Sequence, residues 1–207
     1  MNFSGRLKKL KTNKLFGRYY GVFLLIIMAF VFWAVFKILT PGNFGSPEKM
    51  YYYLQSSIIY SVGACGFYYI IVMGLFDFSI GANIVLSAIV GVILSKQFGY
   101  AGLLIGCIVC GTIIGLLNGT LYVKLKIPSM IVTVGLMLIY ESLASFIAEG
   151  KEQSLDSALQ AFGHAPGNII LALAAFLFAS CVLRYTRIGT YCYAIGSNEH
   201  VAKSMGI

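Results

Sequence analysis

Long apolar stretches separated by short polar connections follow one another along the chain. The first extends from Tyr19 to Leu39, and five more follow, at about 54–75, 78–95, 100–123, 128–148 and 167–184. Each is close to the roughly 20 residues that a helix needs to cross the hydrocarbon core of a bilayer. The pattern predicts an all-α, polytopic transmembrane helix bundle with about six spans.

The connections between the predicted spans hold most of the turn-forming and charged residues. Residues 40–50 contain Pro41, Gly42, Gly45 and Pro47 and predict a loop, and the tyrosines at 51–53 are typical of a membrane interface. Short connections are expected at 95–100 and near Pro128, with a longer polar one at 149–167. The apolar run at 19–39 is too long for a signal peptide, so we interpret it as an uncleaved span.

Composition and charge agree with a membrane protein. The 207 residues are 59% hydrophobic and 11% charged, with a mean hydropathy of +0.86, whereas soluble domains carry about 25% charged residues. The net charge of +8 does not indicate nucleic-acid binding, because the basic residues lie beside the predicted spans. Most of the 15 Lys and Arg fall on one side if the basic leader at 1–18 is cytoplasmic. The positive-inside rule therefore predicts a cytoplasmic N-terminus, a bundle over 19–184 and a cytoplasmic segment at 185–207.

Cysteine and histidine patterns give no sign of a cofactor or metal site. The five cysteines lie in or beside predicted spans, which is not the pattern of a secreted disulfide framework. Cys107 and Cys110 have CxxC spacing, but they lie in an apolar helix, where small packing residues are the favoured interpretation. His164 and His200 are far apart. We therefore expect neither a cofactor nor a metal.

The most informative stretch surrounds Asp77, an acid within apolar, glycine-punctuated sequence that also contains Phe78, Ser79 and Asn83. An aspartate near the centre of a membrane helix costs about 2.5–3.5 kcal/mol on translocon scales, so it usually faces a cavity or a partner. A break at glycines is also where transporters unwind a helix to meet a solute. Asp77 therefore either lines a path or gate, or lies in a turn between two spans. Phe76 and Phe78 are either gate residues or packing aromatics.

Two further polar residues lie within predicted spans. Asn118 is either an interhelical hydrogen-bonding group or part of a solute path, and it follows a run of small residues that allows close helix packing, namely Gly102, Gly106, Gly111 and Gly115, with Gly119 beyond it. Glu141 either lines a cavity or extends toward the outer surface. Together with Asp77 it would suit an ion-coupled carrier or channel, which is the alternative function.

Three blocks together resemble the permease subunits of bacterial ABC importers for ribose, xylose and related simple sugars. They are GLFDFSIG at 74–81, GLLNGTLYVKLKIPSMIVTVGLMLIY at 115–140 and TRIGTYCYAIGSNEHVAKSMGI at 186–207. Their order and spacing match the family. Leu75, Thr190 and Ser197 depart from its usual residues, as do Glu141, Ser142, His200 and Val201.

The resemblance implies a transport function and a set of partners. Such a permease lies in the bacterial plasma membrane and imports a pentose or hexose by alternating access. Its partners are ATPase subunits, a second permease and an extracytoplasmic binding protein. Because the sequence lacks a G-x-x-x-x-G-K-[ST] loop, ATP hydrolysis belongs to the partner and the chain is not an enzyme. Asp77, Phe78, Ser79, Asn83, Asn118 and Glu141 are the candidates for a translocation path or gate.

The third block corresponds in the family to a cytoplasmic coupling helix that docks on the ATPase. The residues carried over are Gly196, Asn198, Glu199, Ala202, Lys203 and Gly206. Glu199 and Lys203, four residues apart, would support one helical turn. Family members normally continue beyond this block with further spans. The resemblance therefore implies that the chain is the N-terminal part of a permease and is not transport-competent alone.

Overall fold

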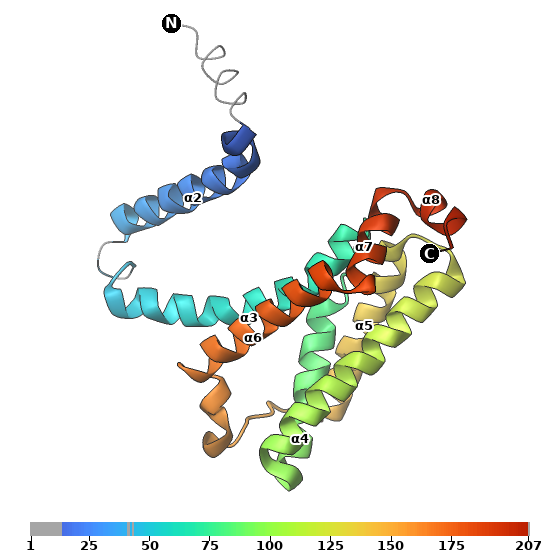
Figure 1. Ribbon diagram of the computed structural model, residues 1–207. Helices are drawn as coiled ribbons and strands as arrows, with labels where there is room; N and C mark the ends of the chain where they lie inside the picture. Colours follow the sequence, from blue (N-terminus) through green and yellow to red (C-terminus); the bar gives the residue numbers. More distant parts are fainter. Residues whose placement is uncertain (1–13, 41, 43, 207) are drawn as a thin grey trace, which may run out of the picture. The chain divides into compact units, whose positions relative to one another are not determined.

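The computed structural model describes residues 14–40, 42 and 44–206, which form two units divided after Leu54 (Figure 1). The described residues form helices and their connections, with no strand among them. Five of the described helices are long and apolar enough to cross a membrane. The predicted all-α polytopic class is therefore confirmed for the described part of the chain.

The first unit contains α2, Lys14–Leu39, and the turn that follows it. The Lys37 ammonium donates to the Phe44 carbonyl at 3.1 Å, and the Phe44 ring lies 5.6 Å from Phe36 and 5.8 Å from Tyr53. Of the basic leader predicted at 1–18, residues up to 13 lie outside the described part, and the remainder belongs to α2. The predicted first span is confirmed as a helix.

The helix α3 covers Pro47–Val72, so the loop predicted over 40–50 is wrong for its last four residues. Proline at the first helical position explains the difference, because its fixed φ suits a helix start and its missing N–H has no partner there anyway. From Gln55 onward α3 belongs to the second unit. It ends before a short non-helical stretch that leads to α4.

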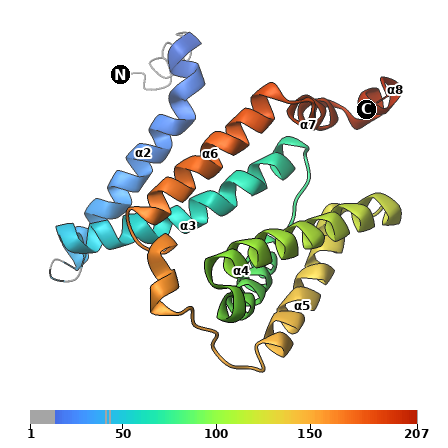
Figure 2. The same ribbon diagram turned by 60° about the horizontal axis from the view of Figure 1, so that its bottom comes forward.

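The helix α4, Ile80–Leu125, is a hairpin of two arms (Figures 1 and 2). Gly99 has non-helical φ and ψ of 57° and −139°, and this single residue turns the chain back. The connection predicted over 95–100 is therefore confined to one residue within continuous helix. The arms at 80–98 and 100–125 correspond to two of the predicted spans, so the five long helices provide six apolar segments of spanning length.

Close packing of the two arms depends on glycines. A Cβ on Gly102 would lie 2.4 Å from the Leu94 carbonyl oxygen, and one on Gly106 would lie 3.0 Å from the Gly91 Cα. The packing predicted for these two small residues is thus confirmed. Gly115 and Gly119, in contrast, have nothing within 4 Å of that position, and both border a cavity described below.

The helix α5, Ser129–Ile147, packs against both arms of α4 (Figures 1 and 2). The hydrophobic core joins Ala82, Leu86 and Ile114 of α4 to Val132, Leu136, Tyr140 and Ala144 of α5. The α5 members are spaced four residues apart, which places them on one helical face. This core fixes α5 against α4, and the site described below lies beside it.

The polar connection predicted at 149–167 is confirmed as non-spanning, and it contains a short 3-10 helix, η1, Ser157–Phe162. It lies beside the α4 turn, since the Lys96 ammonium donates to Gln153 Oε1 at 3.1 Å and the Tyr100 hydroxyl donates to the Ala158 carbonyl at 2.7 Å. Three helices follow it: α6 (Gly167–Tyr185), α7 (Arg187–Ser197) and α8 (Glu199–Ser204).

The hairpin packing leads to a prediction for Gly102→Ala. The new methyl group would collide with the Leu94 carbonyl, and overpacking of this kind costs about 1–3 kcal/mol. We expect the free energy of unfolding to fall by that amount, measured by circular dichroism in mixed micelles with increasing dodecyl sulfate. Gly135→Ala is the control, because Gly135 has open space around it. Equal effects of the two substitutions would contradict the hairpin contact.

Candidate functional site

The site is built around the interruption between α3 and α4. After Val72 the chain leaves the helix, Gly74 adopts a positive φ of 75°, and residues 75–77 have no regular structure before α4 begins at Ile80. Backbone N–H groups freed in a membrane need other partners. The amide of Phe76 donates to Ser129 Oγ and that of Phe78 to Thr133 Oγ1, each at 3.2 Å. Two hydroxyls on α5 therefore satisfy backbone donors of the break.

Asp77, Ser79, Asn118 and Tyr140 form one hydrogen-bonded cluster beside the break. Asp77 Oδ1 accepts from the Ser79 amide at 2.7 Å and from its hydroxyl at 2.6 Å. Asn118 Nδ2 donates to Ser79 Oγ at 2.6 Å and makes a longer contact, 3.4 Å, with Asp77 Oδ2. The Tyr140 hydroxyl donates to Asn118 Oδ1 at 2.6 Å. The cluster joins the break, the second arm of α4 and α5.

Burial makes these hydrogen bonds necessary. Ser79 is fully buried, at 0% exposed, Asn118 is 8% exposed and Tyr140 is 4% exposed. A buried polar group without a partner costs about 1–3 kcal/mol, and the cluster avoids that cost. Asp77 lies in the irregular connection between α3 and α4, the position that one of the two predicted alternatives assumes.

The same carboxylate also borders a cavity of about 460 Å³, so the turn position does not exclude a role in a path. The cavity lies among α3, the break, α4 and α5. Its polar lining consists of Asp77, Asn83, Asn118, Tyr122, Ser129 and Thr133. Phe67 and Phe76 line it as well, with ring centroids 5.8 Å apart, and Phe76 lies 5.9 Å from Phe78. Carboxylate and amide oxygens, hydroxyls and aromatic rings therefore meet at one hollow.

The remaining candidates for the path do not take part in the hydrogen bonds described for the cluster. Asn83 lines the cavity, but its Oδ1 accepts a hydrogen bond from Ser87 at 3.0 Å. Phe78 is 47% exposed and contacts Phe76. Glu141 is exposed and lies with Ser142, Ser145 and Glu149 around a different hollow near the end of α5. The structure does not bring Glu141 together with Asp77, although Glu141 adjoins Tyr140 in sequence.

The α7–α8 segment forms a second candidate surface. The Asn198 side chain caps α8 by accepting from the amides of His200 and Val201 at 3.0 and 3.2 Å. The predicted pair is present, with Lys203 Nζ 2.6 Å from Glu199 Oε1. The hydrogen bond with Lys203 lowers the pKa of Glu199, and the same bond raises the pKa of Lys203. Both groups are therefore charged at neutral pH, and both are exposed.

Two of the small residues in this segment are packed within the chain. A Cβ on Gly196 would lie 1.8 Å from the Val72 carbonyl oxygen at the end of α3. Ala202 is 3% exposed. Gly206 has a positive φ of 81° and follows the end of α8. Gly196 and Ala202 thus have a packing role within the chain, and their predicted contact with an ATPase stays a prediction.

Within the described residues, no group of three or more His, Cys, Asp or Glu side chains could hold a metal ion. The five cysteines are free thiols. The polar groups that do converge are hydrogen-bonding groups at a cavity between membrane-spanning helices.

Comparison with known families matches residues 50–207 to the family described as "Branched-chain amino acid transport system / permease component". The match includes the break, the cluster, the cavity and the α7–α8 segment. The chain belongs to this family. That description is of transport permease components, and the apolar helices of the chain make it a multi-pass membrane protein.

Curated relatives of this permease chain are named for sugars. The fructose import permease protein FrcC of Rhizobium meliloti is 30% identical over 192 residues, covering 83% of the chain and 52% of FrcC. The L-arabinose transport system permease protein AraH of Escherichia coli is 29% identical over 205 residues, covering 95% of the chain and 62% of AraH. The permease chain thus spans about half to two thirds of the length of these relatives. No solved structure matches it significantly.

Sequence reasoning missed Ser129, Thr133 and Tyr140 of the permease. A signal was available, since these residues recur at intervals of four and seven along α5, on the face that also carries Leu136 and Ala144. Hydroxyls on the buried face of a membrane helix indicate hydrogen bonds to another segment. The spacing of the hydroxyls along α5 was therefore enough to predict these three residues.

The cluster leads to a prediction for Tyr140→Phe. The substitution removes one hydroxyl and leaves Asn118 Oδ1 without its donor, so we expect a loss of about 1 kcal/mol in unfolding free energy. Unfolding in mixed micelles measures it. Tyr60→Phe is the matched control, because Tyr60 is 79% exposed and should change stability little. An unchanged stability of Tyr140→Phe would contradict a buried hydrogen bond at this position.

Proposed function

We propose that this permease is part of the membrane pathway of an ATP-driven importer of a simple sugar in the bacterial plasma membrane. The observation that carries the proposal is the cavity beside the broken helix, where Asp77 and Asn118 meet aromatic rings. The names of FrcC and AraH supply the substrate class.

The chemistry of the cavity suits a polyhydroxylated solute. A sugar presents hydroxyls that donate and accept, together with apolar C–H faces. Asp77 Oδ1 already accepts two short hydrogen bonds, whereas its Oδ2 makes the longer contact of 3.4 Å with Asn118. That oxygen can accept from a solute hydroxyl, while Asn83 and Asn118 supply amide groups and Phe67 supplies an apolar face. A few polar groups in a mostly apolar cavity are typical of small-molecule sites.

The proposed transport cycle needs partners. Two permease chains, identical or different, would enclose the path, an extracytoplasmic binding protein would deliver the sugar, and ATPase subunits would bind on the cytoplasmic side. Glu199 and Lys203 would provide the ATPase contact, because they are the exposed charged residues of α8. Alternating access would follow as a shift between two packed arrangements of the spans.

Uptake measurements test the function directly. The whole assembly that co-purifies from native membranes with the tagged permease, including the ATPase, the binding protein and any polypeptide that supplies further spans, is reconstituted in proteoliposomes and supplied with labelled arabinose, fructose, ribose or leucine. We expect sugar uptake that needs ATP and survives collapse of ion gradients. Asp77→Asn should lower it at least about tenfold, the effect of losing about 1.4 kcal/mol of solute interaction. Asp156→Asn, in the polar connection at 149–167, should not.

Two outcomes of this experiment would contradict the proposal. Uptake that persists without ATP and disappears with an ionophore would indicate an ion-coupled carrier. ATP-dependent uptake of leucine instead of sugars would keep the importer and change the substrate class to that named by the family description.

The ATPase contact is tested separately with Glu199→Lys. Charge reversal on the exposed face of α8 should weaken co-purification of the ATPase without unfolding the permease. Glu149→Lys is the matched control, because Glu149 also pairs with a lysine, Lys151, and is similarly exposed in another connection. Gly196→Arg is a poor probe, since any side chain there would collide with the Val72 carbonyl. Equal retention of the ATPase by both Glu variants would contradict docking through α8.

A further inference from the structure

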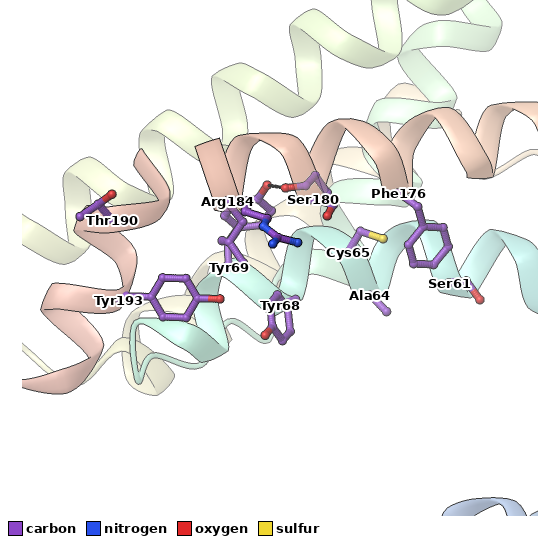
Figure 3. Close-up of a pocket in the computed structure, with 12 residues that line it drawn as sticks. Ser61, Ala64, Cys65, Tyr68, Tyr69, Phe176, Ser180, Arg184, Thr190 and Tyr193 are labelled. Atoms are coloured by element: carbon purple, nitrogen blue, oxygen red, sulfur yellow. Dashed lines mark hydrogen bonds between the residues drawn. The ribbon is translucent and has the colours of Figure 1, made fainter. Parts of the chain in front are cut away.

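A second and larger cavity, of about 800 Å³, lies between α3 and α6 where α6 leads into α7 (Figure 3). Figure 3 shows Tyr68 and Cys65 on one side, Phe176 and Ser180 on another, and Arg184 and Tyr193 toward the α7 end. It shares no lining residue with the cavity at Asp77. It therefore needs a separate explanation.

The apolar part of this cavity lies along two spanning helices that are loosely joined. The Tyr69 hydroxyl donates a hydrogen bond to the Ala179 carbonyl and links α3 to α6. Beside that link the lining is formed by Ala64, Cys65 and Phe176, and the last of these is 46% exposed. An apolar hollow on the surface of membrane-spanning helices meets hydrocarbon, not water.

The other end of the cavity is polar and positively charged. Arg184 lies in the last turn of α6, and the lining also includes Tyr68, Thr190 and Tyr193 but no carboxylate. A hydrogen bond with Tyr68 raises the pKa of the Tyr193 phenol, so the two rings meet at this end. The end of a spanning helix lies near the lipid headgroups, where arginine and tyrosine are favoured.

We propose that this cavity is a binding site for an anionic phospholipid. The phosphate would lie against the guanidinium of Arg184 and the hydroxyl of Thr190, and an acyl chain would follow α3 and α6 toward Phe176. Arginine binds phosphate with two parallel hydrogen bonds, and basic pockets between spanning helices bind anionic headgroups. Arg184 and Phe176 are eight residues apart, or about 12 Å along the helix, which gives an amphiphile room for both its parts.

Charge and shape favour this ligand over a sugar or a soluble anion. A sugar site is expected to combine several acceptors, whereas the charged group lining this cavity is a cation. A soluble anion would use the Arg184 end alone and leave the apolar part of the cavity unfilled. A phospholipid uses both ends at once.

Native mass spectrometry of the purified chain with added phosphatidylglycerol or phosphatidylcholine tests the site. A single arginine at the membrane surface contributes about 1 kcal/mol toward an anionic lipid, so we expect about a fivefold preference for phosphatidylglycerol. Arg184→Gln should remove that preference. Arg187→Gln is the matched control, because it removes a nearby positive charge that does not line the cavity.

Two further variants and a crosslinking measurement locate the lipid. Ala64→Trp should reduce retention of both lipids by filling the apolar part, while Ala174→Trp, on α6 but outside the lining, should not. A diazirine-bearing phosphatidylglycerol in native membranes should label residues 61–69 and 176–184.

Several results would overturn the proposal. One is an absence of preference for phosphatidylglycerol, and another is an equal loss with Arg184→Gln and Arg187→Gln, which would show a general charge effect. A third is labelling confined to other helices in native membranes, which would show that a protein segment covers the cavity.

Discussion

The need to satisfy backbone groups inside a membrane governs the second unit. The interruption between α3 and α4 leaves backbone amide groups without helical partners. Water would form hydrogen bonds with them in a soluble protein, but hydrocarbon cannot. Ser129 and Thr133 accept two of them from α5, and the Asp77 carboxylate accepts a third from Ser79. Because two of these three acceptors lie on α5, the break depends on α5 being packed against it.

The helix α5 therefore has two functions on a single face. Val132, Leu136 and Ala144 form the core with α4, and Thr133 and Tyr140 hold the break and Asn118. Hydrophobic packing sets the distance between the helices, and hydrogen bonds set their register. The cavity at Asp77 remains open because Gly115 and Gly119 present no side chain toward it.

Much of this arrangement could be predicted from the sequence, because length and hydropathy determine which segments can span a bilayer. The six apolar segments, the polar connection after α5 and the Glu199–Lys203 pair were predicted correctly. The start of α3 at Pro47 and the one-residue turn at Gly99 were not, since both depend on local backbone angles. Asp77, Ser79 and Asn118 could be proposed singly, but 41 residues separate Asp77 from Asn118, and only the hairpin shows that they meet. Tyr140 and Thr133 were not predicted, because neither is charged and their hydroxyls lie on a buried face of α5.

The contact between Gly196 and the end of α3 has a mechanical consequence. The missing side chain lets α7 rest directly on the Val72 carbonyl and the Met73 Cα, so no soft side chain lies between the two backbones. Two residues after Val72, Gly74 occupies the left-handed region that glycine adopts easily, and three residues further lies Asp77. A push on α7 toward α3 therefore cannot be absorbed by a rotamer change at this contact. It has to move the end of α3, and Gly74 is the nearest place where the backbone can turn in response.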